Sequence, residues 1–302
     1  MDKPILGWIG TGVIGGSCAS RALAAGYRLI VTTRTKSKAD NLLTSGAIWA
    51  ESAKEVALQA DVVFSTVGYP RDVREIVFGD AGVFEGFKGR EARAYPATYI
   101  DMTTSSPELA NEIFHEGQKR GIATLDAPVS GGDVGARNGT LSIMVGGDRN
   151  DFDRVAELLS TFGTNVRYHG AAGAGQRAKI TNQILIAGNM IGVCEALLYA
   201  YKAGLDLEET LKSVSSGAAG SWSLSNLAPR ILRGDYAPGF YVEHFVKDLG
   251  LALDDAKRLN LALPGVALAS QLYLALMAQG GSRFGTQALV KALAKLSNVD
   301  RF

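Results

Sequence analysis

The hydrophobic pattern of this 302-residue chain changes once, near Gly170. Before that point, short apolar runs alternate with amphipathic stretches of helical period, which is typical of βαβ units built on a parallel sheet. Beyond it only the helical period remains. We therefore expect an α/β fold, with an α/β domain over residues 1–170, a hinge at 171–175 and an all-α domain over residues 171–302.

The same pattern predicts the individual elements. The predicted strands are Leu6–Ile9, Leu29–Thr32, Val62–Thr66, Thr98–Asp101, Thr124–Asp126 and Leu141–Val145. The predicted helices of the second domain are Ile180–Ala203, Leu207–Ser216, Leu249–Leu259, Pro264–Ala278 and Gln287–Leu296.

Composition and charge limit the partners. The net charge is +1 and no polybasic face is evident, so we expect no nucleic-acid partner. The first residues lead at once into a strand-like run, so we expect no targeting segment and a cytoplasmic protein. The two cysteines and three histidines show no ligand spacing, and we expect neither a disulfide nor a metal site.

The most apolar segment is Ile180–Cys194. It falls short of the roughly 20 residues that span a bilayer, so we expect no membrane partner. A helix this poor in charge needs cover on nearly all sides. It would run through the centre of the helical domain or pack against a second copy, and we expect a homodimer or homotetramer.

A glycine fingerprint directly follows the first predicted strand and opens a helix that runs to about Ala25. In the pattern GxGxxG the first glycine permits a tight turn, and the second lets the backbone approach a pyrophosphate at the helix N-terminus. We therefore predict that the first domain is a Rossmann dinucleotide-binding domain. The residues of the fingerprint are Gly10, Thr11, Gly12, Val13, Ile14 and Gly15.

The end of the second strand indicates which dinucleotide binds. An Asp or Glu that would bind an unphosphorylated ribose is missing there, and hydroxyl and basic side chains take its place. We expect NADP, with NADPH preferred over NADH, although a solvated basic turn is the alternative. The predicted cofactor residues of this region and of the turn after Thr66 are Thr33, Arg34, Thr35, Lys38, Val67 and Gly68.

A second glycine-rich segment, Asp126–Thr140, follows a strand in the middle of the chain. Its exposed backbone N–H groups and the Ser130 hydroxyl could hold a carboxylate at the carboxyl end of a parallel sheet. Gly131 and Gly132 would belong to the same site. As an isolated segment it could equally be a surface turn.

One lysine stands at the mouth of the apolar helix. Lys179, Asn182 and Gln183 are spaced i, i+3 and i+4, so they share a helical face. From Ile180 to Cys194 no other residue carries a charge. Partial burial would lower the pKa of Lys179 towards the range in which it exchanges protons, whereas the alternative is a side chain that extends to solvent.

These motifs occur in the order GxGxxG, DAPVSGGxxGAxxG, GxGxxxKxxNQ and Lys247-Asp248-Leu249. In that order they resemble the β-hydroxyacid dehydrogenase family, most closely its 3-hydroxyisobutyrate dehydrogenase-like branch, over almost the whole chain. The resemblance implies hydride transfer between a nicotinamide and the hydroxyl-bearing carbon of a short β-hydroxy acid, or the corresponding semialdehyde. The substrate would be a small-molecule carboxylate.

The resemblance also implies roles for single residues. Lys179 would be the general acid/base, Asn182 would hold the substrate or the lysine, and Ser130, Gly131 and Gly132 would bind the substrate carboxylate. Some relatives place the asparagine one position later, so the roles of Asn182 and Gln183 stay open. The remaining residues implied near substrate or cofactor are Thr104, Phe240 and Lys247. The role of Arg177 also stays open.

Three alternatives stay open at this stage. The enzyme could be an NADPH-dependent glyoxylate or succinic semialdehyde reductase. His244 could serve as the base in place of Lys179. The chain could also be a non-catalytic NADP-binding module, although relatives of that kind tend to lose the lysine that this chain retains.

Overall fold

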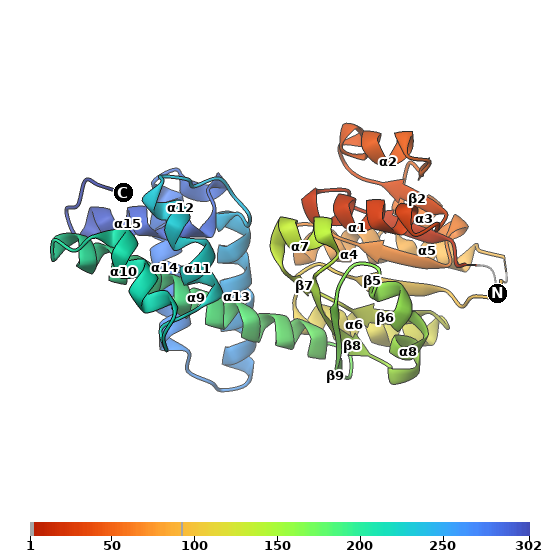
Figure 1. Cartoon of the computed structure of the whole chain (residues 1–302). Coiled ribbons are helices and arrows are strands. Elements are labelled where there is room, and N and C mark those ends of the chain that lie inside the picture. The colour runs from red at the N-terminus through yellow and green to blue at the C-terminus, as the bar shows by residue number, and fades with distance from the viewer. Residues whose placement is uncertain (1–2, 92) are drawn as a thin grey trace. The chain divides into compact units, whose positions relative to one another are not determined.

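The computed structural model describes residues 3–91 and 93–302. The chain divides into two compact units, Met1–Lys179 and Ile180–Phe302, drawn in Figure 1 from red to green and from green to blue. Helix α9, Ala174–Lys202, begins in the first unit and continues into the second.

The first unit is built on one sheet. Among the described residues its strand order is β3-β2-β1-β4-β5-β6-β8-β7, and β9 pairs with β8. The strands are β1 Leu6–Ile9, β2 Leu29–Thr32, β3 Ile48–Trp49, β4 Val62–Ser65, β5 Thr98–Asp101, β6 Ala123–Asp126, β7 Val129–Ser130, β8 Ser142–Gly147 and β9 Asn165–Gly170. Strands β1 to β6 are parallel and have the Rossmann order, which confirms the predicted fold class. The expectation of parallel pairing is wrong for β8, which runs antiparallel to β6 and β7.

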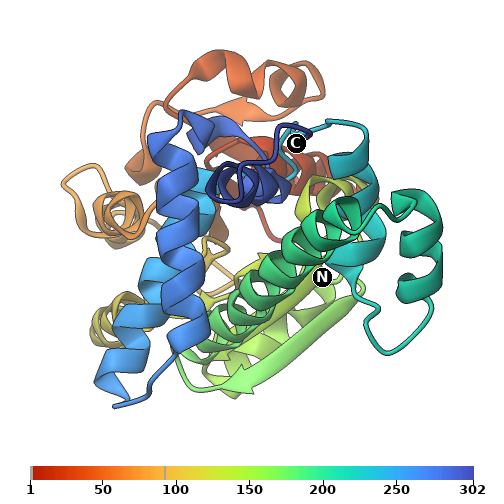
Figure 2. The same cartoon turned by 90° about the vertical axis from the view of Figure 1, so that its left-hand side faces the viewer.

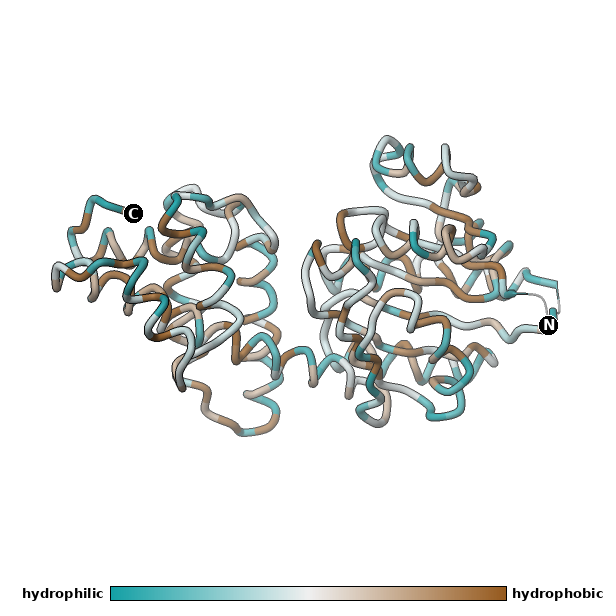
Figure 3. The backbone as a smooth tube through the Cα atoms, in the orientation of Figure 1, coloured by the Kyte–Doolittle hydropathy of each residue, from teal (hydrophilic) through white to brown (hydrophobic). Residues whose placement is uncertain are grey.

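Both faces of the sheet are covered by helices. Alternate residues of a strand point to opposite faces, so Trp8 and Phe64 join one core and Ile9 joins the other. The Trp8 and Phe64 rings stack with centroids 4.8 Å apart. Strands β1, β2, β4 and β5 are buried along their whole length, as cover on both faces requires, and hydrophobic stretches run through this unit in Figure 3.

The helices of the first unit connect the strands and pack on the sheet. Ser52, Ser106 and Asp148 each accept a hydrogen bond from a backbone N–H at the start of a helix, so local sequence fixes those ends. The helices are α1 Val13–Ala24, η1 Lys36–Ala39, α2 Asp40–Thr44, α3 Ala53–Gln59, α4 Pro70–Phe78, α5 Val83–Lys88, α6 Pro107–Lys119, α7 Gly132–Asn138 and α8 Arg149–Leu159.

The second unit is helical, as expected, apart from one isolated bridge between Tyr241 and Gly285. Its helices, besides α9, are α10 Leu207–Ser215, α11 Trp222–Asn226, α12 Ala228–Leu232, α13 Val242–Arg258, α14 Pro264–Ala278, η2 Gly281–Arg283, η3 Thr286–Ala288 and α15 Leu289–Leu296. The long helices of this unit, visible in Figure 2, share one core that includes Met190, Phe245, Tyr273 and Leu289.

Helix α9 is longer than predicted and is only partly covered by the rest of the chain. It has 29 residues, because it begins at Ala174, six positions before the predicted start at Ile180, and one 18-residue window has a mean hydropathy of 1.6. By length and composition alone it could cross a membrane, but a single such helix is weak evidence. Only 39% of that window is buried, and Leu185 is 64% exposed, so the chain itself does not cover the helix on nearly all sides.

Candidate active site

The fingerprint glycines lie where β1 ends and α1 begins. Gly10 has a φ of +92°, and a Cβ there would lie 2.3 Å from the carbonyl oxygen of Thr66. A Cβ on Gly15 would lie 2.1 Å from the carbonyl oxygen of Gly10. Both positions therefore require glycine, the first for its backbone conformation and both for the tight packing around the turn.

The same turn leaves room and hydrogen-bonding capacity for a pyrophosphate. Gly12 precedes the first residue of α1, and a Cβ there would meet nothing within 4 Å. The first turn of α1 carries no acidic residue, and the buried Thr11 hydroxyl has no hydrogen-bond partner within the part of the chain described. An open helix N-terminus with an unused hydroxyl fits the phosphates of a dinucleotide.

The basic turn after β2 also meets an acid that the sequence pattern did not reveal. Arg34 is 84% exposed and its Nη1 lies 3.8 Å from Oδ1 of Asp72, in the first turn of α4. Thr35 immediately precedes η1, and the Lys36 ammonium lies over the Trp49 ring. The end of β2 carries no acidic residue, as the sequence shows. The carboxylate of Asp72, 38 positions later in the chain, lies beside Arg34 instead.

The turns after β4 and β5 are bonded to each other. The N–H of Val67 donates to the Thr103 hydroxyl over 3.0 Å, and the N–H of Thr103 donates to Oδ1 of Asp101 over 3.0 Å. The backbone N–H of Val67, a predicted cofactor-binding residue, is thus engaged within the protein. Half-buried Thr104 and Gly68 belong to these two turns, at the carboxyl edge of the sheet.

The segment expected to bind a carboxylate is more regular than expected. Val129 and Ser130 form β7, and α7 begins at Gly132, so the expected open loop is reduced to the turn between them. Gly131 and Gly132 have φ angles of +132° and +62° and are exposed. These two glycines let the strand turn directly into the helix, beside half-buried Ser130.

Lys179 is buried, with 7% exposure, in the second turn of α9. The first turn of that helix is anchored to the sheet: Asp126, the last residue of β6, accepts hydrogen bonds from the N–H groups of Gly173 and Gln176, each at 2.8 Å. The Gln176 side chain extends the anchor to the turn after β5. Asp126 and Gln176 both lie within the sequence motifs, but the motifs alone indicate no role for either residue.

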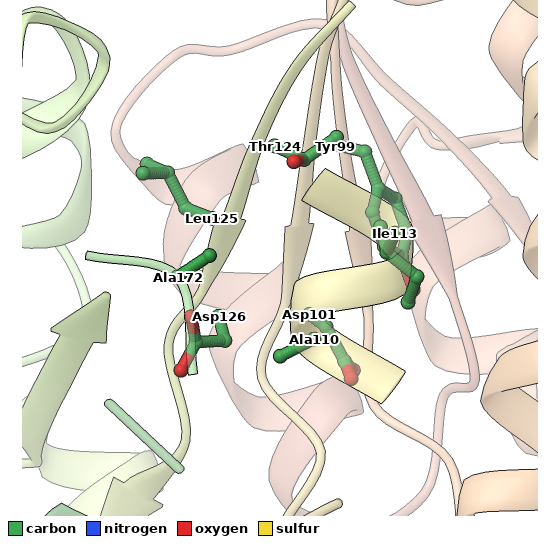
Figure 4. Close-up of a pocket in the computed structure, with 8 residues that line it drawn as sticks. All are labelled: Tyr99, Asp101, Ala110, Ile113, Thr124, Leu125, Asp126 and Ala172. Carbon is green, nitrogen blue, oxygen red and sulfur yellow. The ribbon is translucent and has the colours of Figure 1, made fainter. Parts of the chain in front are cut away.

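A small cavity lies between α6 and the ends of the paired strands β5 and β6. Asp101 and Asp126 are paired in the sheet register, and both line this space of about 10 Å³, shown in Figure 4. Burial raises the pKa of Asp101 from 3.8 to about 6, opposed by hydrogen bonds from Ser65 and Thr103. Burial also raises the pKa of Asp126, opposed by the N–H groups of the α9 anchor.

In the second unit, four polar residues on two helices form a chain. The Asn182 side chain donates to Oε1 of Gln183 over 2.8 Å, and Gln183 donates to Oδ2 of Asp248 over 2.7 Å. The Lys247 ammonium lies 2.9 Å from Oδ1 of Asp248. The two amides are thus bonded to each other and, through Gln183, to the Lys247-Asp248 pair, and which of them holds the substrate or the lysine stays a prediction.

The two other candidates of this unit lie at the start of α13. Phe240 is half-buried and its ring lies 6.3 Å from that of His244. Burial, and next the charge of Lys247, lower the pKa of His244. Around neutral pH this favours a neutral imidazole.

Comparison with known proteins agrees with this architecture. Residues 5–170 match the NAD binding domain of 6-phosphogluconate dehydrogenase, and residues 173–293 match the NAD-binding domain of NADP-dependent 3-hydroxyisobutyrate dehydrogenase. A Bacillus subtilis (strain 168) protein described as an uncharacterized oxidoreductase, YkwC, is 50% identical over 97% of this chain and 100% of its own. The 2-hydroxy-3-oxopropionate reductase of Escherichia coli (strain K12) is 40% identical over 97% of this chain and 98% of its own.

A solved structure gives the same result. The 3-hydroxyisobutyrate dehydrogenase of Mycobacterium tuberculosis, solved with L-serine, superposes with a TM-score of 0.84 at 28% identity and covers 97% of this chain and 99% of its own. The chain belongs to the β-hydroxyacid dehydrogenase family. It is an NAD(P)-dependent oxidoreductase that acts on hydroxyl groups, which removes the alternative of a non-catalytic module.

Proposed function

We propose that this enzyme interconverts a short β-hydroxy acid of the 3-hydroxyisobutyrate type and its semialdehyde, with Lys179 as the general acid/base. The observation that carries the proposal is a buried lysine whose helix is bonded to the carboxyl edge of a dinucleotide-binding sheet. At that edge a substrate can meet the cofactor. The names of the relatives, a 2-hydroxy-3-oxopropionate reductase and a 3-hydroxyisobutyrate dehydrogenase, support this substrate class.

The proton step falls to Lys179. A bound nicotinamide supplies or accepts the hydride. In reduction, the Lys179 ammonium donates a proton to the carbonyl oxygen as negative charge develops there, and in oxidation its neutral amine removes the hydroxyl proton. Asn182, one helical turn further along α9, would hold the substrate or orient the lysine. Burial keeps water from competing for that proton.

The substrate carboxylate would be bound by the turn after β7. Its proposed ligands are the Ser130 hydroxyl and the N–H groups of Gly131 and Gly132, and the exposure of both glycines supports access from solvent. Thr104 would lie between this group and the nicotinamide. Phe240, Gln183 and Lys247 keep the roles implied by family resemblance, as predictions.

We further propose that NADPH is preferred over NADH. Exposed Arg34, with Thr33, Thr35 and Lys38 in the same turn, offers a guanidinium and hydroxyls to a 2′-phosphate. The family that matches residues 173–293 is described as that of an NADP-dependent dehydrogenase, which supports this choice. Since NADPH usually drives reductions, the preferred direction would be from semialdehyde to hydroxy acid.

A substrate panel tests the reaction. Purified enzyme would be assayed for NADPH oxidation with tartronate, methylmalonate and succinic semialdehydes and with glyoxylate, and for NAD(P)+ reduction with 3-hydroxyisobutyrate. We expect the highest kcat/KM for a three- or four-carbon β-semialdehyde or its hydroxy acid. A clear preference for glyoxylate or succinic semialdehyde would replace this proposal with the reductase alternative, and no turnover on the whole panel would refute both.

We also propose that the enzyme is a homodimer or homotetramer that uses the exposed face of α9. Leu185 and Tyr199 are 64% and 74% exposed on this apolar helix, and Gly188 and Gly192 lie between them on the exposed side. Leu185→Asp should shift the protein towards monomer in light scattering. The same substitution at Leu259, which is 57% exposed at the end of α13, is the control.

A further inference from the structure

We propose that Gln176 is a positioning residue, which holds the turn around Thr104 in register with Lys179 by bonding to the peptide groups on both sides of Thr104. This inference rests on the proposed function, which places Lys179 and Thr104 beside the reacting atoms. Its structural basis is a buried amide with no contact to solvent, one turn before the lysine on the same helix.

The two hydrogen bonds of Gln176 use both ends of its amide. Nε2 donates to the carbonyl oxygen of Thr103 over 2.8 Å, and Oε1 accepts from the N–H of Ser105 over 2.9 Å. The two partners flank Thr104 directly. A single side chain therefore fixes the orientation of the peptide groups that carry this threonine.

The helix end of this link is also fixed. The N–H of Gln176 donates to Asp126, and Asp126 is itself confined by glycines. A Cβ on Gly175 would lie 2.4 Å from the Met144 carbonyl oxygen, and one on Gly146 would lie 2.6 Å from Oδ1 of Asp126. These close contacts fix the first turn of α9 against β6 and β8. The side-chain amide of Gln176 then bonds this fixed turn to the turn after β5.

The neutral amide of Gln176 satisfies both partners at once, at any pH. A carboxylate at position 176 would accept from Ser105 but repel the carbonyl oxygen of Thr103, whereas a protonated carboxyl could make both bonds. An apolar side chain would leave a buried N–H and a buried C=O without partners. Because displacements near 1 Å can cost about 100-fold in rate, loss of the link should reduce turnover more than cofactor binding.

The experiment compares Gln176→Leu and Gln176→Glu with Gln287→Leu. Gln287 is the matched control, since it is 1% exposed and donates to two backbone carbonyl oxygens in the second unit, of Asp235 and Ala237. The measurements are NADPH affinity by fluorescence, kcat with the best panel substrate between pH 6 and pH 8.5, and backbone hydrogen exchange over residues 102–106.

We expect Gln176→Leu to lower kcat roughly 10- to 100-fold with NADPH affinity changed less than about threefold. Gln176→Glu should recover towards wild type as the pH falls, since its protonated form restores the donor to Thr103. Exchange at Ser105 should accelerate in Gln176→Leu and stay unchanged in Gln287→Leu. The pH-dependent recovery gives a result even if the leucine variant does not fold.

Three results would overturn the inference: a kcat of Gln176→Leu close to wild type, an equal loss in Gln287→Leu, or an activity of Gln176→Glu, relative to wild type, that does not change with pH. Failure of the proposed function is distinguishable. In that case the wild type turns over no panel substrate, while the exchange at Ser105 still reports whether Gln176 holds the turn.

Discussion

The carboxylate of Asp126 accepts a 2.8 Å hydrogen bond from the backbone N–H of Gln176, 50 positions later in the chain. A residue at the end of a strand thereby caps the helix that carries Lys179. Because this cap is buried, the backbone N–H groups that donate to it could not form hydrogen bonds with water if the carboxylate were removed.

Replacement of this cap should be costly. Asp126→Ala leaves the N–H groups of Gly173 and Gln176 buried without acceptors, and we expect a loss of about 2–5 kcal/mol in the free energy of unfolding. The matched control is Asp148→Ala, since Asp148 caps α8 at the surface and should cost only about 1 kcal/mol. Urea denaturation measures both, and equal losses would contradict a special role for the buried cap.

Gly175 should tolerate no side chain. In Gly175→Ala the new methyl group would lie 2.4 Å from the Met144 carbonyl oxygen, and we expect a loss of more than about 2 kcal/mol in the free energy of unfolding. Gly250 is the control, because it lies in helix α13 and a Cβ there meets nothing within 4 Å. Gly250→Ala should be neutral or stabilising by up to about 1 kcal/mol. Thermal unfolding of the two variants decides the matter, and a stable Gly175→Ala protein would refute the packing argument.

The raised pKa of Asp101 predicts a pH dependence of stability. Its folded pKa, about 6, exceeds the unfolded value of 3.8, so the folded protein binds more protons and loses stability as the pH rises through this window. Asp101→Asn keeps an acceptor for Ser65 and Thr103 but cannot ionise. The free energy of unfolding of Asp101→Asn minus that of the wild type should increase by about 2 kcal/mol from pH 4.5 to pH 7.5. A constant difference between the two proteins over this range would show that Asp101 does not titrate there.

Arg34 should decide between the two cofactors. Arg34→Gln removes the guanidinium expected at the 2′-phosphate, and we expect NADPH to bind about 10- to 100-fold more weakly while NADH changes little. Arg28→Gln is the control, since Arg28 is exposed at the opposite end of β2. Titration calorimetry with both cofactors measures the effect. An equal loss for NADPH and NADH would mean that Arg34 does not contact the phosphate.

Much of the fold follows from local patterns. The limits of β1, β2, β5 and α14 agree with the sequence predictions, because buried strands and helices with clear ends carry strong hydrophobic signals. The two-residue strands β3 and β7 carry no such signal. Strand β9 is missing from the predicted strands although the sequence carries its period of two, because exposed Asn165, Arg167 and His169 alternate with half-buried Val166 and Tyr168.

Long-range contacts account for what the sequence did not reveal. Helix α7 has a glycine-rich sequence of low helical propensity, and the Arg21 guanidinium supports its end by donating to the carbonyl oxygen of Arg137. The motifs contained Asp126 and Gln176, but nothing local shows which helix an acid caps or which turn an amide bridges. The same holds for Asp72 beside Arg34.

The central claim is that Lys179 carries the proton, and one comparison tests it most directly. Turnover and NADPH affinity would be measured for Lys179→Met, His244→Ala and, as a control on the same helix, Lys202→Ala. We predict that Lys179→Met binds NADPH normally but loses about 100- to 10,000-fold in kcat, with little change in the other two. The assignment would be contradicted by near-normal turnover in Lys179→Met. It would also be contradicted if His244→Ala, and not Lys179→Met, lost about 100- to 10,000-fold in kcat.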